Sequence, residues 1–220
     1  MNLELLPMTL SELASHELPD LLHRFLKKET FSRSDFEIKL SLSEFKKREK
    51  LIELYLMQGG LPGACFIRDP KLRAQKIIDQ LETILNRDLR EVQKTSLTLR
   101  ELLGFVRTLA QNDGEILHYQ ELRRETGMTP LTQKRLLFAL EAVFVIRPIL
   151  LEGDYKGYCV YFEDQVEAFI LSQNKINREQ QWIGLVYRNL REQAFYRIGQ
   201  NIEFFQYRTR GGALVPVAVR

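Results

Sequence analysis

Cysteine, histidine and tryptophan are scarce in this chain, whose 220 residues include two cysteines, three histidines and one tryptophan. Cys65 and Cys159 are too few to form a disulfide scaffold or a zinc ribbon, so we expect both to be small buried hydrophobic residues. The three histidines, His16, His23 and His118, form no ligand cluster. The sequence therefore predicts no metal site built on these residues.

Long apolar runs and nucleotide-binding motifs are also absent. No apolar run approaches the roughly 20 residues needed to span a bilayer. The opening MNLELLPMTLSEL carries acids where a secretory signal would carry bases. No glycine precedes a lysine, and neither G-x-G-x-x-G nor the nucleophile motif G-x-S-x-G occurs. We therefore expect a cytoplasmic protein that binds no membrane, holds no cofactor and lacks a phosphate loop.

The composition is that of a folded domain with an uneven charge distribution. Hydrophobic residues make up 45% of the chain and charged residues 28%, which excludes a disordered or fibrous protein. The formal net charge is +3, yet the segment from Lys175 to Arg220 alone carries eight basic and three acidic side chains, a net charge of +5. Such a basic segment is compatible with an anionic partner, nucleic acid included, and equally with a solvated basic face.

Residues 1–95 predict helices joined by short turns. Pro19 suits the first turn of a helix that runs to Lys28, because a proline there loses no hydrogen bond. A longer helix follows Ser43 and ends at Gly59-Gly60, where glycine can take a left-handed closing conformation. Asp69-Pro70 then provides an N-cap and a first-turn proline for a helix that extends to about Lys94.

Residues 96–163 predict a winged helix-turn-helix. Ser96 or Thr98 can cap its first helix, and Thr129-Pro130 opens its last one. The predicted elements are a helix, a short extended segment, a helix, a second helix after a glycine turn, and a hairpin, over residues 99–109, 115–117, 119–126, 130–143, 145–151 and 158–162. This order of elements is typical of the winged helix.

The two short helices of this segment carry the residue types that a DNA-recognition unit uses, because amide and basic groups contact base edges and phosphates. The candidate DNA-binding residues are Arg123, Arg124, Thr132, Gln133, Lys134 and Arg135. Phe138 and Glu141 lie on the same helix, and they favour the alternative that the helix only packs or contacts protein. Both interpretations stay open at this point.

A second hypothesis concerns catalysis near the N-terminus. Pro19-Asp20, followed by Glu37-Ile38-Lys39, matches the letters of a metal-dependent nuclease signature. In that signature two carboxylates hold a divalent ion and a lysine assists the attacking water. The candidate catalytic residues are Asp20, Glu37 and Lys39. The alternative places Asp20 in the N-terminal turn of a helix, where its charge stabilises the helix dipole.

Six motifs in order resemble the C-terminal domain of unknown function that follows the AAA-type ATPase core in bacterial and archaeal ATPases. Each motif is weak alone, but together they span nearly the whole chain. They are Leu6-Pro7-Met8-Thr9-Leu10-Ser11-Glu12, Tyr55-Leu56-Met57-Gln58-Gly59-Gly60-Leu61-Pro62, Leu85-Asn86-Arg87-Asp88-Leu89, the segment from Thr129 to Ile146, Tyr161-Phe162-Glu163-Asp164, and Tyr207-Arg208-Thr209-Arg210-Gly211-Gly212.

The departures from this family limit the activity that the resemblance implies. In the family the ATPase core precedes the first motif. The core is absent here, so we expect a fragment, a split gene product or a stand-alone remnant. The resemblance also implies a restriction-endonuclease-like end over residues 164–220. The acids expected there are missing at 182–186 and 212–215, so we expect no nuclease activity from this end.

The sequence therefore predicts an α+β protein with three parts: a mostly helical part (1–95), a central winged helix-turn-helix (96–163) and an incomplete nuclease-like α/β segment (164–220). The leading hypothesis is a non-catalytic accessory domain of a prokaryotic AAA-type ATPase, which binds duplex DNA or a partner protein such as a separate ATPase subunit. The alternatives are the metal-dependent nuclease and a purely structural or protein-interaction module.

Overall fold

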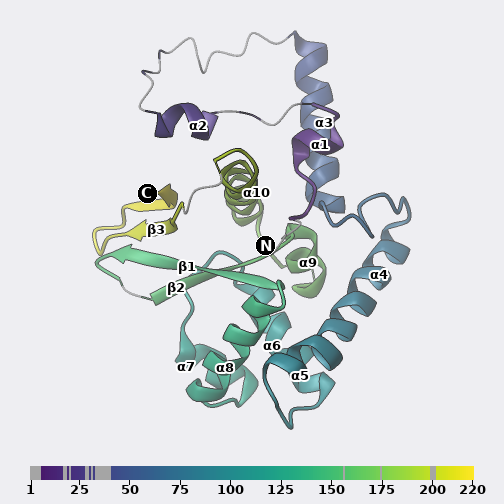
Figure 1. Ribbon diagram of the computed structural model, residues 1–220, viewed down its shortest axis with the longest axis vertical. Coiled ribbons are helices and arrows are strands. Elements are labelled where there is room, and N and C mark those ends of the chain that lie inside the picture. The colour runs from purple at the N-terminus through teal and green to yellow at the C-terminus, as the bar shows by residue number, and fades with distance from the viewer. Residues whose placement is uncertain are drawn as a thin grey trace.

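The fold is known from a computed structural model, which describes residues 6–16, 19, 21–27, 30, 32, 41–155, 157–173, 175–198 and 202–220. Helices and strands both contribute, as expected for an α+β protein (Figure 1). The helices of the first half are α1 (Leu10–Leu13), α2 (Leu21–Leu26), α3 (Leu42–Gln58), α4 (Pro70–Thr83), the π-helical turn η2 (Ile84–Asp88), α5 (Leu89–Val92) and α6 (Leu99–Gln111). The later elements are α7 (Tyr119–Thr126), α8 (Pro130–Ala142), β1 (Ile146–Gly153), β2 (Gly157–Phe162), α9 (Gln165–Leu171), α10 (Arg178–Gln193), η3 (Ala194–Ile198), β3 (Phe204–Arg208) and β4 (Leu214–Val219).

Side-chain caps set the starts of the main helices. Thr98 and Thr129 accept a hydrogen bond from the third backbone N–H of α6 and α8, respectively, so both predicted caps are confirmed. Asp69 caps α4 in the same way, with Pro70 in its first turn. The predicted single helix from Asp69 to Lys94 is interrupted by the π-helical turn η2 and ends at Val92.

The four strands form one mixed sheet in the order β2-β1-β3-β4. β1 and β2 are the predicted hairpin, paired antiparallel with Ile149 opposite Cys159. β3 then pairs parallel to β1, with Leu150 opposite Phe205, and β4 returns antiparallel to β3. The hairpin and the C-terminal strands therefore share one sheet, which crosses the boundary predicted at residues 163/164.

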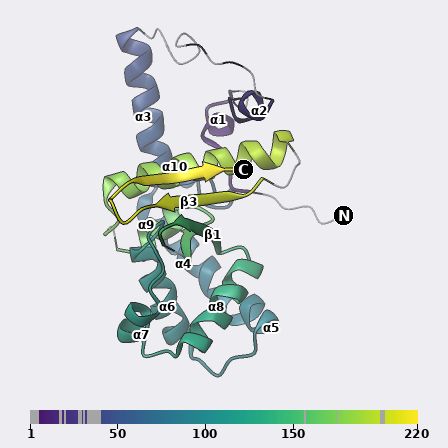
Figure 2. The same ribbon diagram turned by 90° about the vertical axis from the view of Figure 1, so that its left-hand side faces the viewer.

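Helices cover both faces of this sheet. In Figures 1 and 2, α10 lies along one face, while α6 and α8 lie against the other. On the α10 side, Tyr187 packs against Tyr161 with ring centroids 4.3 Å apart. On the opposite side, Ile146 and Phe162 join a larger core formed with α5, α6 and α8. Alternate residues of the hairpin thus serve two cores, and the helices of the two halves are linked through it.

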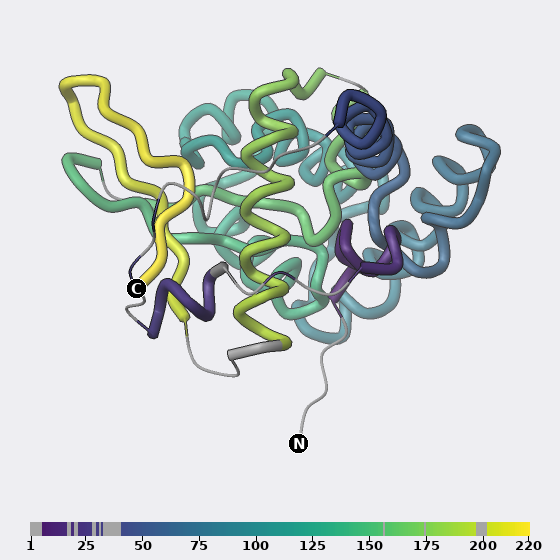
Figure 3. Tube along the Cα trace, turned by 90° about the horizontal axis from the view of Figure 1, so that it is seen from above, coloured from purple at the N-terminus to yellow at the C-terminus, as the bar shows by residue number. Residues whose placement is uncertain are grey.

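Seen from above, α10 crosses the middle of the molecule, with β3 and β4 on one side and α3 and α4 on the other (Figure 3). α3 projects away from the sheet (Figure 1), and only its last turns hold buried residues, Tyr55 and Leu56. No helix in the described part of the chain is long and apolar enough to cross a membrane.

Candidate functional site

α7 and α8 carry the predicted DNA-binding residues, five of which reach the surface at least in part. Arg123 and Arg124 are exposed on α7, and Lys134 and Arg135 are exposed on α8. Thr132 is half-buried in the first turn of α8, where its backbone N–H donates to the cap Thr129. These five candidates therefore lie on two helices that contact each other, and four of them are exposed.

Gln133 does not reach the surface, so its prediction as a DNA-binding residue is wrong. Its residue is fully buried, and its side-chain amide donates a hydrogen bond to the backbone carbonyl of Met128 at 3.0 Å. It points inward because it lies on the same side of α8 as Leu136 and Leu140, which are also buried. Its amide holds the turn before α8 in place instead of contacting a ligand.

The charges around the four exposed cations are nearly balanced. On α7, Arg123 and Arg124 lie between Glu121 and Glu125 in sequence, and all four are exposed. Arg124 lies 3.8 Å from the Glu121 carboxylate, an exposed pair that contributes little energy. α7 therefore adds no net charge to the surface, and the basic character of α8 is confined to Lys134 and Arg135.

Most arginines of the basic C-terminal segment are paired with carboxylates of this chain. Arg188 forms a buried ion pair with Asp113 at 3.1 Å, and Arg208 pairs with Glu115 at 3.0 Å. The other pairs are Arg178 with Glu53, Arg191 with Glu163, and Arg220 with Glu203. Five of the arginines behind the local charge of +5 thus bind carboxylates of this chain. This finding removes most of the charge argument for a nucleic-acid partner.

The outer face of α8 carries exposed apolar side chains, which sequence reasoning did not assign to a site. We define this face by Leu131, Lys134, Arg135, Phe138 and Glu141. Leu131 and Phe138 are 60% and 65% exposed, respectively, on the side of α8 that points away from the core. Their spacing of seven residues, two helical turns, is the signal that could have found them in the sequence.

A groove of about 360 Å³ runs along this face. α8 contributes Leu137 and Phe138 to it, Tyr119 comes from α7, and the hairpin contributes Tyr158 and Val160. Lys134 and Glu141 line the same groove. The Lys134 ammonium lies 5.5 Å from the centre of the Tyr119 ring, a distance at which a cation–π interaction holds it at the groove wall. We call this feature the α8 groove.

A second cluster, the carboxylate junction, joins α3, α9 and α10 to the N-terminal segment. We define it by Tyr55, Asp164, Glu167, Arg188 and Glu192. Asp164 caps α9 by accepting the Val166 N–H, and it also accepts the N–H of Gly60. The Tyr55 hydroxyl donates to the carbonyl of Met8 at 2.9 Å, and the Met8 N–H donates to the carbonyl of Gly60 at 2.7 Å.

Two acids of the junction are buried without full hydrogen bonding. One carboxylate oxygen each of Glu167 and Glu192 has no hydrogen-bond partner among the described residues. Burial raises the pKa of Glu192 to about 9, and it raises the pKa of Glu167 well above its ordinary value. The nearby Asp164 carboxylate raises both pKa values further. Glu192 therefore carries a proton at neutral pH.

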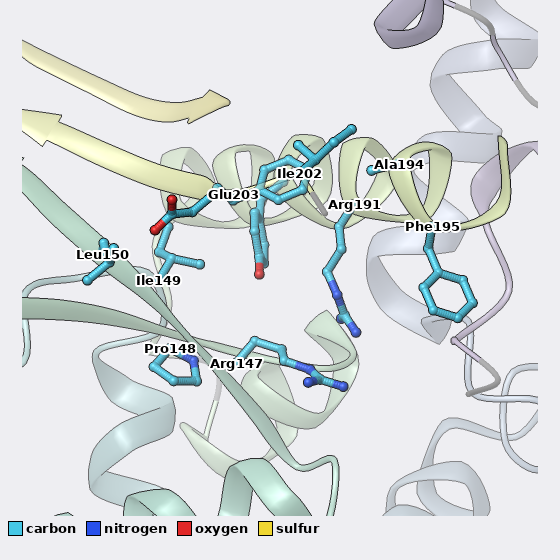
Figure 4. A pocket seen from close by; sticks show the side chains of 11 residues that line it. Arg147, Pro148, Ile149, Leu150, Arg191, Ala194, Phe195, Ile202 and Glu203 are labelled. Carbon is cyan, nitrogen blue, oxygen red and sulfur yellow. The ribbon is translucent and has the colours of Figure 1, made fainter. Parts of the chain in front are cut away.

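A pocket of about 340 Å³ lies between β1 and the end of α10 (Figure 4). Arg147 from β1 and Arg191 from α10 extend toward each other in it. Both guanidinium groups bind the buried carboxylate of Glu163. Tyr187 also lines the pocket, and burial raises its pKa to about 12. The two arginines are thus oriented by an acid of this chain, and the arrangement ties β1 to α10.

The structure does not test the nuclease hypothesis. Asp20, Glu37 and Lys39 lie outside the described residues. Within the part of the chain that the structure describes, no group of three or more His, Cys, Asp or Glu residues is arranged to hold a metal ion. Cys65 and Cys159 are buried thiols, as expected.

Comparison with known proteins adds one finding. Residues 49–150 match the profile of a domain of unknown function (DUF8612), which covers the chain from the second half of α3 to β1. No curated protein and no solved structure matches the chain. The matched segment contains α7 and α8, and nothing in the match links it to an AAA-type ATPase or to prokaryotes.

Proposed function

We propose that this chain is a non-catalytic interaction module that binds a partner protein through the outer face of α8. Residues 96–163 would form a winged helix-turn-helix that presents this face. The order α6, α7, α8, β1 and β2 supports the winged helix, as does the isolated bridge between Ile116 and Cys159 that ties the segment before α7 to the hairpin.

The observation that carries this proposal is the exposure of Phe138 beside the α8 groove. An exposed phenylalanine leaves unused roughly 1.5–3 kcal/mol that full burial would contribute. Single exposed apolar residues are common, but a patch that includes a groove marks a binding surface. Leu131 and Phe138 form such a patch with the groove lined by Tyr119, Leu137 and Tyr158.

Photo-crosslinking in the cells that produce the chain tests this proposal. A photoreactive phenylalanine analogue replaces Phe138 in one variant and the exposed Glu125 of α7 in a matched control. We expect a discrete protein adduct from position 138 and none from position 125, because only the first lies on the outer face of α8. Equal labelling at the two positions, or none at either, would contradict the proposal.

A second candidate function is duplex DNA binding by the same winged helix. The exposed side chains of Arg123, Arg124, Lys134 and Arg135 favour it, because phosphate contacts dominate nucleic-acid affinity. The acids of α7 and Glu141 on α8 weigh against it, since they place negative charge on the same surface. Protein binding is therefore the leading candidate function.

The narrower proposal, that the module serves a separate AAA-type ATPase subunit, is supported by the six motifs alone. Three of these motifs meet at the carboxylate junction, through Met8, Gly60 and Asp164. The resemblance thus concerns a packing junction and carries no nucleotide chemistry.

Calorimetric titration of the purified chain with Mg-ATP should give no binding heat. Turnover of ATP by the chain alone would contradict a non-catalytic role.

A further inference from the structure

We infer that the partner of the outer face of α8 is a second copy of this chain, bound with the two α8 helices antiparallel about a two-fold axis. This inference rests on the proposed function and identifies its partner. It follows from how the charges and the apolar side chains are spaced along α8.

Leu131, Lys134, Phe138 and Glu141 follow one another at intervals of three and four residues, which places them on one face of a helix with about 3.6 residues per turn. Lys134 and Glu141 are seven residues apart, or about 10.5 Å along the helix axis. Both line the α8 groove, so they lie on the same flank of the outer face. Phe138 lies between them.

This pattern is complementary to itself only in the antiparallel orientation. A two-fold axis midway between Lys134 and Glu141 places each lysine opposite the glutamate of the second copy, which gives two identical ion pairs. The axis passes beside Leu137 and Phe138, so the apolar side chains lie at the centre of the contact. In a parallel pair related by a two-fold axis, the flank with Lys134 and Glu141 would face the opposite flank of the second copy, which carries Arg135 and Ala142, so these lysine–glutamate pairs would not form.

The α8 groove provides space for the apolar part of this contact. Its walls include Tyr119 and Tyr158, and Tyr158 is 44% exposed. A phenylalanine of the second copy can enter it from the side on which Lys134 and Glu141 lie. A nucleic acid is the poorer occupant, because Glu141 would repel its phosphates. An acidic peptide is poorer for the same reason.

The experiment is sedimentation analysis of the full chain over a wide range of concentrations, with charge-reversal variants. The wild type should reach twice the 25.9 kDa mass of one chain. Lys134→Glu and Glu141→Lys should each weaken dimerisation roughly tenfold, because each converts two attractive pairs into repulsive ones. The double variant restores opposite charges and should return to within about threefold of the wild type.

Arg123→Glu on α7 is the matched control. It makes the same charge change as Lys134→Glu at an exposed position outside the outer face of α8, and it should dimerise like the wild type. Lys134→Gln and Glu141→Gln repeat the test without like-charge repulsion in case a reversal variant fails to fold. Phe138→Asp should abolish the dimer while the melting temperature of the monomer stays normal.

A wild type that stays monomeric at every concentration would overturn the inference, and so would a folded double variant that remains as weak as the single ones. A monomer that still yields an adduct with a different protein at position 138 would overturn the second copy as partner and keep the proposed function. A monomer that yields no adduct would overturn both.

Discussion

The carboxylate junction and the outer face of α8 distribute polarity in opposite ways. At the junction, Asp164, Glu167, Arg188 and Glu192 are buried between helices. On α8, Phe138 is exposed to solvent on the far side of the helix from the core. Burying charged groups costs free energy unless they are paired and hydrogen-bonded, and exposing phenylalanine leaves its burial energy unused. Each region therefore departs from the usual pattern of buried apolar and exposed polar side chains: the junction buries charged groups, and α8 exposes an apolar one.

The difference separates what holds the fold together from what can bind a partner. The motifs that support the family resemblance contribute Met8, Gly60 and Asp164 to the junction, where backbone segments from three parts of the chain meet. The α8 groove, in contrast, is lined by the exposed Phe138 and by the charged Lys134 and Glu141 on either side of it in sequence. These three motif residues thus hold the packing of this chain together, whereas a binding surface has to be found from exposure and geometry.

The largest effect is expected at the junction, from Arg188→Ala. Arg188 pairs with Asp113, and its Nε donates to the carbonyl of Phe162. Removal leaves the Asp113 carboxylate buried without its cation, which typically costs about 3–5 kcal/mol. Urea unfolding should show this loss, while Arg135→Ala on the exposed face of α8 should change the unfolding free energy by less than about 0.5 kcal/mol. Similar losses in both variants would remove the contrast between the two regions.

A smaller loss is expected from Gly60→Ala, with Gly63→Ala as control. A Cβ atom on Gly60 would lie 2.1 Å from the carbonyl oxygen of Met8, whereas a Cβ on Gly63 meets nothing within 4 Å. The first substitution forces apart the N-terminal segment and the end of α3, at a cost of about 1–3 kcal/mol. The second should leave the melting temperature unchanged or raise it slightly. Equal melting temperatures would show that the junction can open without cost.

The pH dependence of stability should sharpen the comparison. Glu192 has a pKa of about 9 in the fold, because it is buried, against an ordinary value of 4.5. The folded state therefore binds a proton that the unfolded state releases. Stability falls as pH rises between these two values, by roughly 1 kcal/mol per pH unit for this group, and levels off above the higher one. Glu167, whose pKa is also raised, acts in the same direction.

Glu192→Gln should remove part of this slope, because glutamine is a neutral side chain of similar shape. Unfolding free energies measured from pH 5 to pH 9 test it, a range chosen to lie inside the titration window. Glu125→Gln, an exposed substitution, provides the reference for removing a surface acid. If the slope of Glu192→Gln matches that of the wild type, Glu192 is ionised in the fold and the junction is more hydrated than its burial indicates.

Local features of the fold were predictable from the sequence because they depend on neighbouring residues. The caps at Thr98 and Thr129 follow from side-chain oxygens near free N–H groups, and the hairpin follows from alternation around a turn. The parallel pairing of β1 with β3 was not predictable, because Leu150 and Phe205 are separated in sequence by β2, α9 and α10. No local pattern encodes such a pairing.

The candidate site was predictable in position but not in character. Residues of α8 were identified as a surface, yet the burial of Gln133 depends on how α8 packs on the rest of the core, which the sequence of one helix does not show. The charge of the C-terminal segment misled for a similar reason. Arg188 and Asp113 are 75 residues apart in sequence, so their pairing appears only in three dimensions.

The smallest effect is expected for DNA, from the double substitution of Lys134 and Arg135 by alanine. If α8 entered a groove of duplex DNA, affinity would fall steeply with salt, and the double variant would flatten the salt slope by about two units, roughly one per lost phosphate contact. If the outer face of α8 binds protein, any weak DNA affinity is non-specific, and the variant should lower the affinity and the slope no more than the loss of two cations from α7 does. Fluorescence anisotropy with a labelled duplex at several salt concentrations measures both.

Arg123→Ala with Arg124→Ala is the matched control, because it removes the same charge from α7. A loss of affinity confined to the α8 variant, at a normal melting temperature, would reverse the order of the two candidate functions and assign Phe138 to the rim of a DNA-binding surface.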